Sequence, residues 1–115
     1  MISISTFRNI ALSFPETTED PHFEKISFRV KKKIFATYDP VANRASIKLS
    51  EIDQHIYSSA DKLNIFPVAN KWGKQGWTLI ELNKVSKDLF IEALTKAYCE
   101  VAPQKLAGQV ERNDG

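Results

Sequence analysis

Residues 26–49 read ISFRVKKKIFATYDPVANRASIKL, and three short segments within them alternate between apolar and polar side chains. An alternation with a period of two predicts β-strands that bury one face. We expect strands at 26–30, 33–38 and 44–49, with turns at Lys31-Lys32 and at residues 39–43. Because the links between them are short, these strands predict an antiparallel meander.

The first hairpin of the meander has a predicted register. A two-residue turn at Lys31-Lys32 would pair Val30 with Lys33, and Phe28 with Phe35. This register places on one face Ile26, Phe28 and Phe35, and on the other Arg29, Ile34 and Ala36. In the third strand the alternation is clean, and it directs inward Ala45, Ile47 and Leu49.

Helices are expected on both sides of the meander in the sequence. Apolar residues at helical spacing follow Ser3, Ser50 and Ser86, and each serine hydroxyl can cap a helix N-terminus. The first helix should end at Pro15 and the last at Pro103.

The middle helix should run from the capping serine to about residue 60. Ile52 and Ile56 are its predicted apolar contacts. After it, we expect a loop beginning at Phe66-Pro67 and a fourth strand over residues 77–82. The polar stretch 16–20 is expected to be a connection.

The predicted fold class is α+β. A single domain over residues 1–107 would contain an antiparallel sheet, with the three-strand meander plus at least one later strand, packed with N-terminal, middle and C-terminal helices. Residues 108–115 are polar and predict a flexible C-terminal tail. A chain of 115 residues that is 43% hydrophobic suits one domain with its own core.

Several functional classes are disfavoured by composition. The single cysteine, Cys99, excludes an internal disulfide framework and a cysteine-rich zinc site. No signal peptide and no membrane-spanning apolar stretch is recognisable, so we expect a cytoplasmic protein that does not associate with membranes. We also expect no cofactor and a monomer.

Positive charge is concentrated in two segments of the chain. The net charge is +2, yet residues 29–49 hold six basic side chains and one acidic one. Residues 71–84 hold three basic side chains and one acidic one. This clustering, more than the overall charge, indicates a surface for a negatively charged partner.

Both tryptophans lie in the run Trp72-Gly73-Lys74-Gln75-Gly76-Trp77. Two closely spaced glycines indicate unusual backbone angles or a close approach of the backbone to another group. Indole rings beside lysines combine apolar area with positive charge, as binding surfaces often do.

Three stretches of the chain resemble the MmcQ/YjbR family of small bacterial proteins, and together they span about residues 5–107. They are Phe14-Pro15-Glu16 with residues 22–25, 28–30 and 33–37; Phe66-Pro67 with the run 72–77; and Ala97-Tyr98 with residues 101–106. The resemblance implies a single α+β domain with an antiparallel sheet. Members of the family look similar to the double-wing DNA-binding domain of a phage MotA-type transcription factor, and this likeness suggests DNA binding.

The chain departs from the family pattern at two places. Where the family often has an Asn-Gly-like turn, this chain has Lys31-Lys32, and lysine resists the positive φ of a type I′ turn. The turn should be wider than two residues or strained. Asn70 stands where relatives tend to carry an aromatic residue, so a stacking role at that position is in doubt.

The leading hypothesis is a DNA-binding module with two basic projections, at residues 29–33 and 71–77. The candidate nucleic-acid-binding residues are Arg29, Lys31, Lys32, Lys33, Lys71, Trp72, Lys74 and Gln75. Structural interpretations compete with it: a solvated hairpin tip for the lysines, and core packing for Trp77 with Trp72 covering it. The alternative function is a protein-interaction module anchored by the Trp72–Trp77 loop.

No catalytic site is recognisable, and we do not expect an enzyme. His22 is surrounded by carboxylates, but no metal-ligand spacing accompanies it. Cys99 lies beside the apolar stripe of the last helix and is expected to be a partly buried structural thiol. His55 is expected to be a surface residue of the middle helix. A small-molecule ligand near Trp72 and His22 would overturn this view.

Overall fold

The computed structural model describes residues 1–113 and contains an antiparallel six-stranded sheet in the order β1-β2-β3-β4-β6-β5. Along the chain the elements are α1 (Ile4–Ser13), β1 (Thr17–His22), β2 (Lys25–Val30), β3 (Lys33–Asp39), β4 (Arg44–Lys48), α2 (Glu51–Ala60), β5 (Ile65–Pro67), α3 (Lys71–Lys74), β6 (Trp77–Glu81), α4 (Lys87–Val101) and α5 (Gln104–Asn113). The predicted α+β class and the meander, β2 to β4, are confirmed.

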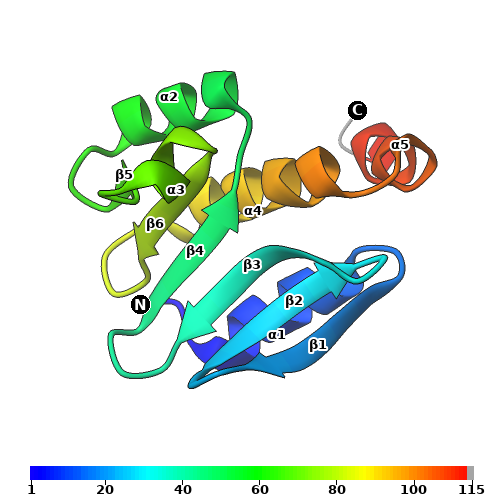
Figure 1. Cartoon of the computed structure of the whole chain (residues 1–115), viewed down its shortest axis with the longest axis horizontal. Helices are drawn as coiled ribbons and strands as arrows, with labels where there is room; N and C mark the ends of the chain where they lie inside the picture. The colour runs from blue at the N-terminus through cyan, green and yellow to red at the C-terminus, as the bar shows by residue number, and fades with distance from the viewer. Residues whose placement is uncertain (114–115) are drawn as a thin grey trace.

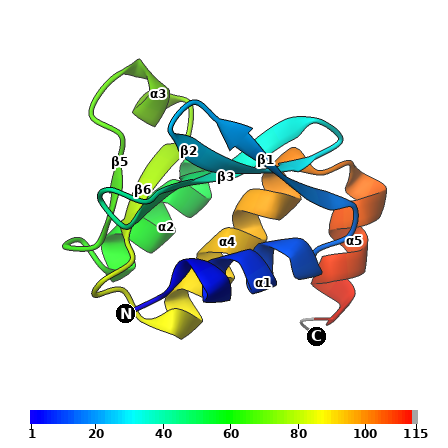
Figure 2. The same ribbon diagram turned by 90° about the horizontal axis from the view of Figure 1, so that it is seen from below.

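The helices are distributed unequally over the two faces of the sheet. Helices α1, α2 and α4 pack on one face, and α5 packs against α4 (Figures 1 and 2). The short α3 projects on the opposite side, above β5 and β6 (Figure 2). We call this second side the open face, because its strands β1 to β4 carry no helix.

Side chains alternate between the two faces in rows that cross the whole sheet. One row faces the helices and consists of Pro21, Ile26, Tyr38, Ala45, Ile80 and Ile65. The next row lies on the open face and consists of Asp20, Ser27, Thr37, Ser46, Leu79 and Phe66. The sheet therefore has an apolar, helix-covered face and a mixed face that is available for binding.

Aromatic side chains join the helices to the covered face of the sheet. The ring of Phe7 in α1 lies 5.0 Å from that of Phe28 and 5.1 Å from that of Phe90, centroid to centroid. A second group of rings joins α4 to β3 through Phe35 and Tyr98, 5.5 Å apart. Such pairs add to the burial of apolar area, and they fix the helices in place.

The predicted helix starts are confirmed by their capping bonds. Ser3 Oγ accepts a hydrogen bond from the backbone N–H of Thr6, and Ser50 Oγ accepts one from that of Asp53. Ser86 Oγ accepts the equivalent bond from Leu89. Each hydroxyl satisfies one of the amide groups that a helix leaves unpaired at its start.

The predicted register of the first hairpin is correct at its tip and wrong beyond it. Val30 pairs with Lys33, but a bulge follows, so that Phe28 pairs with Ala36 instead of Phe35. Phe35 is the extra residue, and both Phe35 and Ala36 are fully buried. A bulge changes which face the following residues occupy, so Ala36 joins the covered face and not the open one.

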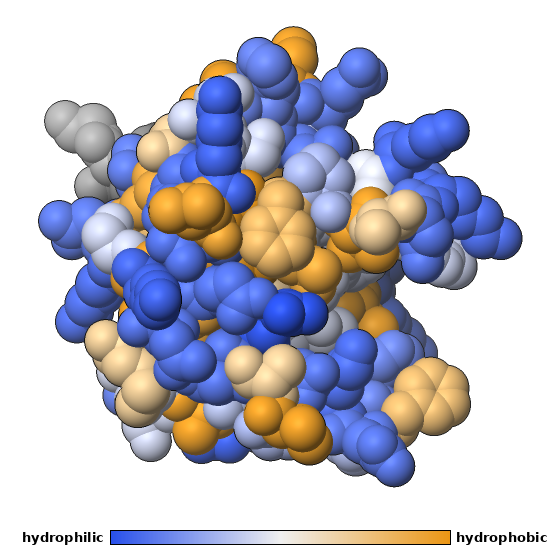
Figure 3. Space-filling view, turned by 90° about the vertical axis from the view of Figure 1, so that its left-hand side faces the viewer, coloured by the Kyte–Doolittle hydropathy of each residue, from blue (hydrophilic) through white to orange (hydrophobic). Residues whose placement is uncertain are grey.

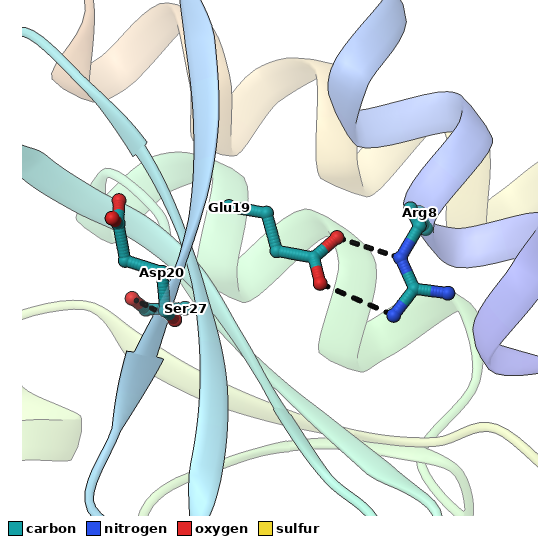
Figure 4. A network of polar contacts seen from close by, with 4 residues as sticks. All are labelled: Arg8, Glu19, Asp20 and Ser27. Carbon is teal, nitrogen blue, oxygen red and sulfur yellow. Dashed lines mark hydrogen bonds and ion pairs between the residues drawn. The ribbon is translucent and has the colours of Figure 1, made fainter.

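The polar stretch expected to be a connection contains the edge strand β1. Its partner is β2, and its residue Glu19 points toward α1, where Arg8 binds it through two contacts of 2.6 Å and 3.1 Å (Figure 4). Asp20 points to the other side of the strand (Figure 4). The strand is held by pairing with β2 and by this ion pair. Its apolar content is too low for the sequence pattern to predict a strand.

The middle helix has the predicted bounds but the opposite orientation. Ile52 and Ile56, the predicted apolar contacts, are 73% and 51% exposed, whereas Tyr57 is buried. The reason is that α2 turns Tyr57 and the polar Gln54 inward, where the Gln54 amide binds the segment around Trp77. The loop expected at Phe66-Pro67 is instead the short edge strand β5.

The expected flexible tail also requires correction. Residues 108–113 form the second half of α5, and Leu106, Ala107 and Val110 of this helix are buried. These three residues form an apolar stripe at helical spacing within a sequence that is otherwise polar. Burial of the stripe accounts for the helix. Residues 114–115 of the expected tail lie outside the described residues. Within residues 1–113, no helix is long and apolar enough to cross a membrane.

Candidate functional site

The Trp72–Trp77 run forms the short helix α3 and the turn into β6. Asn70 caps the helix, because its side-chain oxygen accepts a hydrogen bond of 2.9 Å from the backbone N–H of Trp72. A Cβ atom on Gly73 would overlap the carbonyl oxygen of Val68, and one on Gly76 would overlap that of Leu49. The glycines therefore let the run approach the protein's own backbone, and not a ligand.

Three further contacts fix the run to the rest of the sheet. The backbone N–H of Leu49 donates to the carbonyl oxygen of Gly76 at 2.9 Å. The side-chain amide of Gln54 donates to the carbonyl oxygens of Gly73 and Trp77, at 3.0 Å and 3.3 Å. Because α2 and β4 both hold it, the run is a rigid part of the fold.

Neither tryptophan belongs to the core, which corrects the expectation for Trp77. Its neighbour Thr78 faces the helices and is fully buried, so Trp77 lies on the open face and is half-buried. Trp72 is 49% exposed on α3. Both indoles border one groove.

This groove lies between α3 and the β1–β2 turn, and its volume is about 540 Å³. Its lining residues are His22, Lys25, Ile34, Thr37, Ser46, Val68, Trp72, Trp77 and Leu79. In Figure 2 the β1–β2 turn and α3 both rise on the same side of the sheet, and in Figure 3 the surface is hollowed on the right between two projecting parts. We call this feature the tryptophan groove.

The β1–β2 turn carries an unusual aromatic residue next to His22, which lines the tryptophan groove. Phe23 is 94% exposed and has a φ of 59°, a backbone conformation that residues with a side chain seldom adopt. Its ring packs edge-on against that of His22, with 4.9 Å between centroids. Phe23 borders a separate hollow on the turn itself, together with His22, Glu24 and Lys25.

Lysines lie in the tryptophan groove and on the elements beside it. Lys25 lines it, and Lys71 holds its Nζ atom 5.6 Å from the centre of the Trp72 ring. Lys74 and Gln75 are exposed on α3, where no ion pair forms within the described part of the chain. Lys48 lies on the open face opposite Trp77.

The second predicted projection, the β2–β3 turn, is a strained two-residue turn. Lys31 and Lys32 have φ values of 50° and 70°, so the expectation of strain is confirmed and that of a wider turn is not. Lys31 Nζ binds a Glu16 carboxylate oxygen at 2.6 Å. Lys32 and Lys33 are exposed and have no ion-pair partner among residues 1–113.

Arg29 and Arg44 are less available than the lysines. Arg29 Nε lies 3.9 Å from Asp20 and donates a hydrogen bond to Ser27 Oγ. Arg44 binds Glu81 at 2.5 Å across β4 and β6. Arg29 also borders a second hollow of about 720 Å³ at the β2–β3 turn, together with Lys31 and Lys32.

The structure does not bring the two predicted basic projections together. The β2–β3 turn lies at the end of the sheet opposite α3, and α3 instead faces the β1–β2 turn (Figures 1 and 2). His22 and Lys25 therefore line the site, although neither was among the candidate nucleic-acid-binding residues. Only the register of the unrecognised strand β1 would have indicated them.

The remaining candidates keep structural roles. No group of three histidine, cysteine or acidic side chains that could hold a metal occurs in the described residues. Cys99 is half-buried, with its Sγ atom 3.9 Å from the carbonyl oxygen of Ala107 in α5. His55 is exposed, as expected.

Comparison with known proteins places the chain in a family. A family model described as YjbR matches residues 12–100. No curated protein matches the chain. The crystal structure of Deinococcus radiodurans protein DR2400, described as a DUF419 domain, has a TM-score of 0.78 and 21% sequence identity, over 96% of this chain and 89% of that one. That likeness establishes the fold, while the family model spans most of the sequence. The chain therefore belongs to the YjbR family.

Proposed function

We propose that the protein is a DNA-binding module that uses the open face and the turns around it. One observation carries the proposal: lysines without an ion-pair partner in the described part of the chain gather on this side of the molecule. They are Lys25, Lys32, Lys48, Lys71 and Lys74, and the exposed Lys33 follows Lys32 at the same hairpin tip. Unpaired lysines can neutralise phosphates and release counterions, which is the main source of affinity for nucleic acid.

The positions of the lysines favour one extended ligand. The molecule measures 33 × 29 × 27 Å, close to the length of about one turn of duplex DNA, roughly 34 Å. Lys32 and Lys33 at one end and Lys71 and Lys74 at the other would contact phosphates that lie far apart along the strand. The proposal is of a binding protein that needs neither a cofactor nor a catalytic step.

Fluorescence polarisation with a labelled 20-base-pair duplex, titrated at several salt concentrations, tests the proposal. If the four terminal lysines each contact a phosphate, the slope of log K against log salt should be about −3.6. The double variant Lys32→Ala/Lys33→Ala should reduce the steepness of this slope by about 2 and weaken binding to all sequences alike.

A matched control removes the same charge from the helical side. Lys87 and Lys105 are exposed on α4 and α5, away from the open face. The variant Lys87→Ala/Lys105→Ala should leave the slope close to that of the wild type. Equal effects of both double variants, or the absence of binding at low salt, would reject the proposal.

A second candidate function is a protein-interaction module anchored by the Trp72–Trp77 loop. The observation in its favour is that Trp72 is 49% exposed on a rigid helix beside apolar Val68 and Leu79. Aromatic anchors of this kind often dominate binding between proteins. A partner that binds equally well in nuclease-treated extract, and is lost with Trp72→Ala, would favour this function over DNA binding.

A further inference from the structure

We infer that the tryptophan groove binds an unpaired nucleobase, stacked on Trp72, with its adjoining phosphate held by Lys25 and Lys71. The inference rests on the proposed function and makes it more specific, since it assigns an exposed base of a DNA strand to one place in the fold. A free nucleotide offers the same chemistry, and the experiment below separates the two.

The exposed aromatic side chains at the groove are the first argument. Trp72 leaves half of its surface in water, and Phe23 leaves 94%. Phe23 has a positive φ, a conformation that costs about 1–2 kcal/mol, and its ring contacts that of His22, which lines the groove. Its exposure beside the groove leaves the ring free to contact a strand bound there.

The shape and lining of the groove fit a single base. A volume of about 540 Å³ lies in the range of sites for small ligands, about 300–1,000 Å³. Ile34, Val68 and Leu79 supply an apolar floor for the base plane. The hydroxyl groups of Thr37 and Ser46 lie on the same floor and can bind the polar edge of a base.

The position of the base between two projections explains why it must be unpaired. The groove is bounded by the β1–β2 turn on one side and by α3 on the other. A base within a duplex is covered on both faces by its neighbours and cannot stack on a side chain. A base in a single strand, or one extruded from a duplex, presents its face freely.

The lysines at the rim favour a nucleotide over an apolar side chain of a protein. Lys71 Nζ lies over one face of the Trp72 ring, 5.6 Å from its centre, so the base would stack on the other face. Lys25 lines the opposite wall, next to His22. Cations that flank a stacking ring are typical of sites that bind single strands.

Tryptophan fluorescence can report on this site directly. In a Trp77→Phe protein, Trp72 is the only tryptophan, so its emission isolates the proposed stack. We expect quenching by a 12-nucleotide oligothymidylate, and much weaker quenching by a blunt duplex of the same length. The mononucleotide dTMP should quench only at far higher concentration, because it lacks the phosphates that the other lysines bind.

Affinity measurements on the wild-type background provide the second part of the test. Trp72→Ala should weaken oligothymidylate binding about 5- to 150-fold, whereas Trp72→Phe should keep most of the affinity. Phe23→Ala should weaken binding in the same direction. Circular dichroism verifies the fold of each variant, and because both side chains are exposed, folding should be unaffected.

The outcomes separate this inference from the proposed function. Salt-dependent duplex binding that needs Lys32 and Lys33, with no quenching of Trp72 by any strand, would overturn the inference and leave the proposed function in place. Equal affinity for dTMP and the oligomer would overturn the assignment to a DNA strand. If neither duplex nor strand binds, both proposals fail.

Discussion

Gly76 determines where the Trp72–Trp77 run lies in the fold. Its φ of 105° and its approach to the Leu49 carbonyl leave no room for a side chain. The sequence indicated that glycine was needed in this run, but not which backbone approached it. That approach depends on the pairing of β4 with β6, and no local sequence pattern indicates which strands pair.

Alanine substitutions at two glycines should change stability in opposite directions. Gly76→Ala should lower the free energy of unfolding by more than about 2 kcal/mol, because it adds both strain and overlap with backbone. Gly108→Ala, in helix α5 with open space around the new methyl group, should raise it by about 0.5–1 kcal/mol. Urea unfolding measures both, and changes of the same sign would contradict the account.

Helix α2 illustrates what an element's sequence pattern can and cannot predict. Its cap at Ser50 and its extent were predicted correctly, because capping and spacing are local. Its orientation was not, because the pattern of Ile52 and Ile56 indicated the wrong face. The polar Gln54 faces inward since the backbone groups of the tryptophan run need a donor there.

On α2, substitution of a polar residue should therefore reduce stability more than substitution of an apolar one. Gln54→Ala should destabilise the protein by about 1–2 kcal/mol, because three part-buried acceptors each lose one hydrogen bond. Ile52→Ala should change stability by no more than about 0.5 kcal/mol, because Ile52 is 73% exposed. Thermal unfolding distinguishes them, and a larger loss for Ile52→Ala would contradict this orientation of the helix.

Strand β1 was not predicted from the sequence, and this omission had the largest effect on the candidate site. Its residues, Thr17–His22, carry no apolar alternation, and they are held by pairing with β2 and by polar contacts such as the Arg8–Glu19 ion pair. Because the strand was unrecognised, His22 and Lys25 could not be assigned to a surface shared with β3, β4 and β6. The family resemblance identified the fold class but did not supply this contact.

At the scale of the molecule, Tyr98 joins the two layers. Its ring packs between Phe14 and Phe35, and its hydroxyl donates a hydrogen bond of 2.7 Å to the carbonyl oxygen of Pro15. Burial raises the pKa of the Tyr98 phenol above its ordinary value, and Cys99 and Glu16 add to this effect. The protein therefore favours the neutral phenol.

Stability should consequently decline at alkaline pH. Because the pKa in the folded protein is raised, the contribution of Tyr98 is complete below about pH 10 and is lost as pH rises through the folded value. Tyr98→Phe should be less stable than the wild type by about 1–2 kcal/mol at pH 8, since the Pro15 carbonyl loses its donor. The gap between the two proteins should narrow above pH 10.

Urea unfolding of both proteins from pH 8 to pH 11.5 measures this difference. Lysines and the other tyrosines are common to both, so they affect the two curves alike. Parallel curves over the whole range would show that Tyr98 does not titrate with folding.

The strand order β1-β2-β3-β4-β6-β5 has a consequence for how the protein is made. As the chain leaves the ribosome, the first four strands can pair with one another at once, but the outer edge of β4 stays without a partner until β6 emerges. Helix α4, which covers β3 and β4, follows later still. The nascent protein thus passes through a stage with a bare strand edge and an uncovered apolar face, which is the combination most prone to aggregate. The last third of the chain closes both, first the strand edge with β6 and then the apolar face with α4.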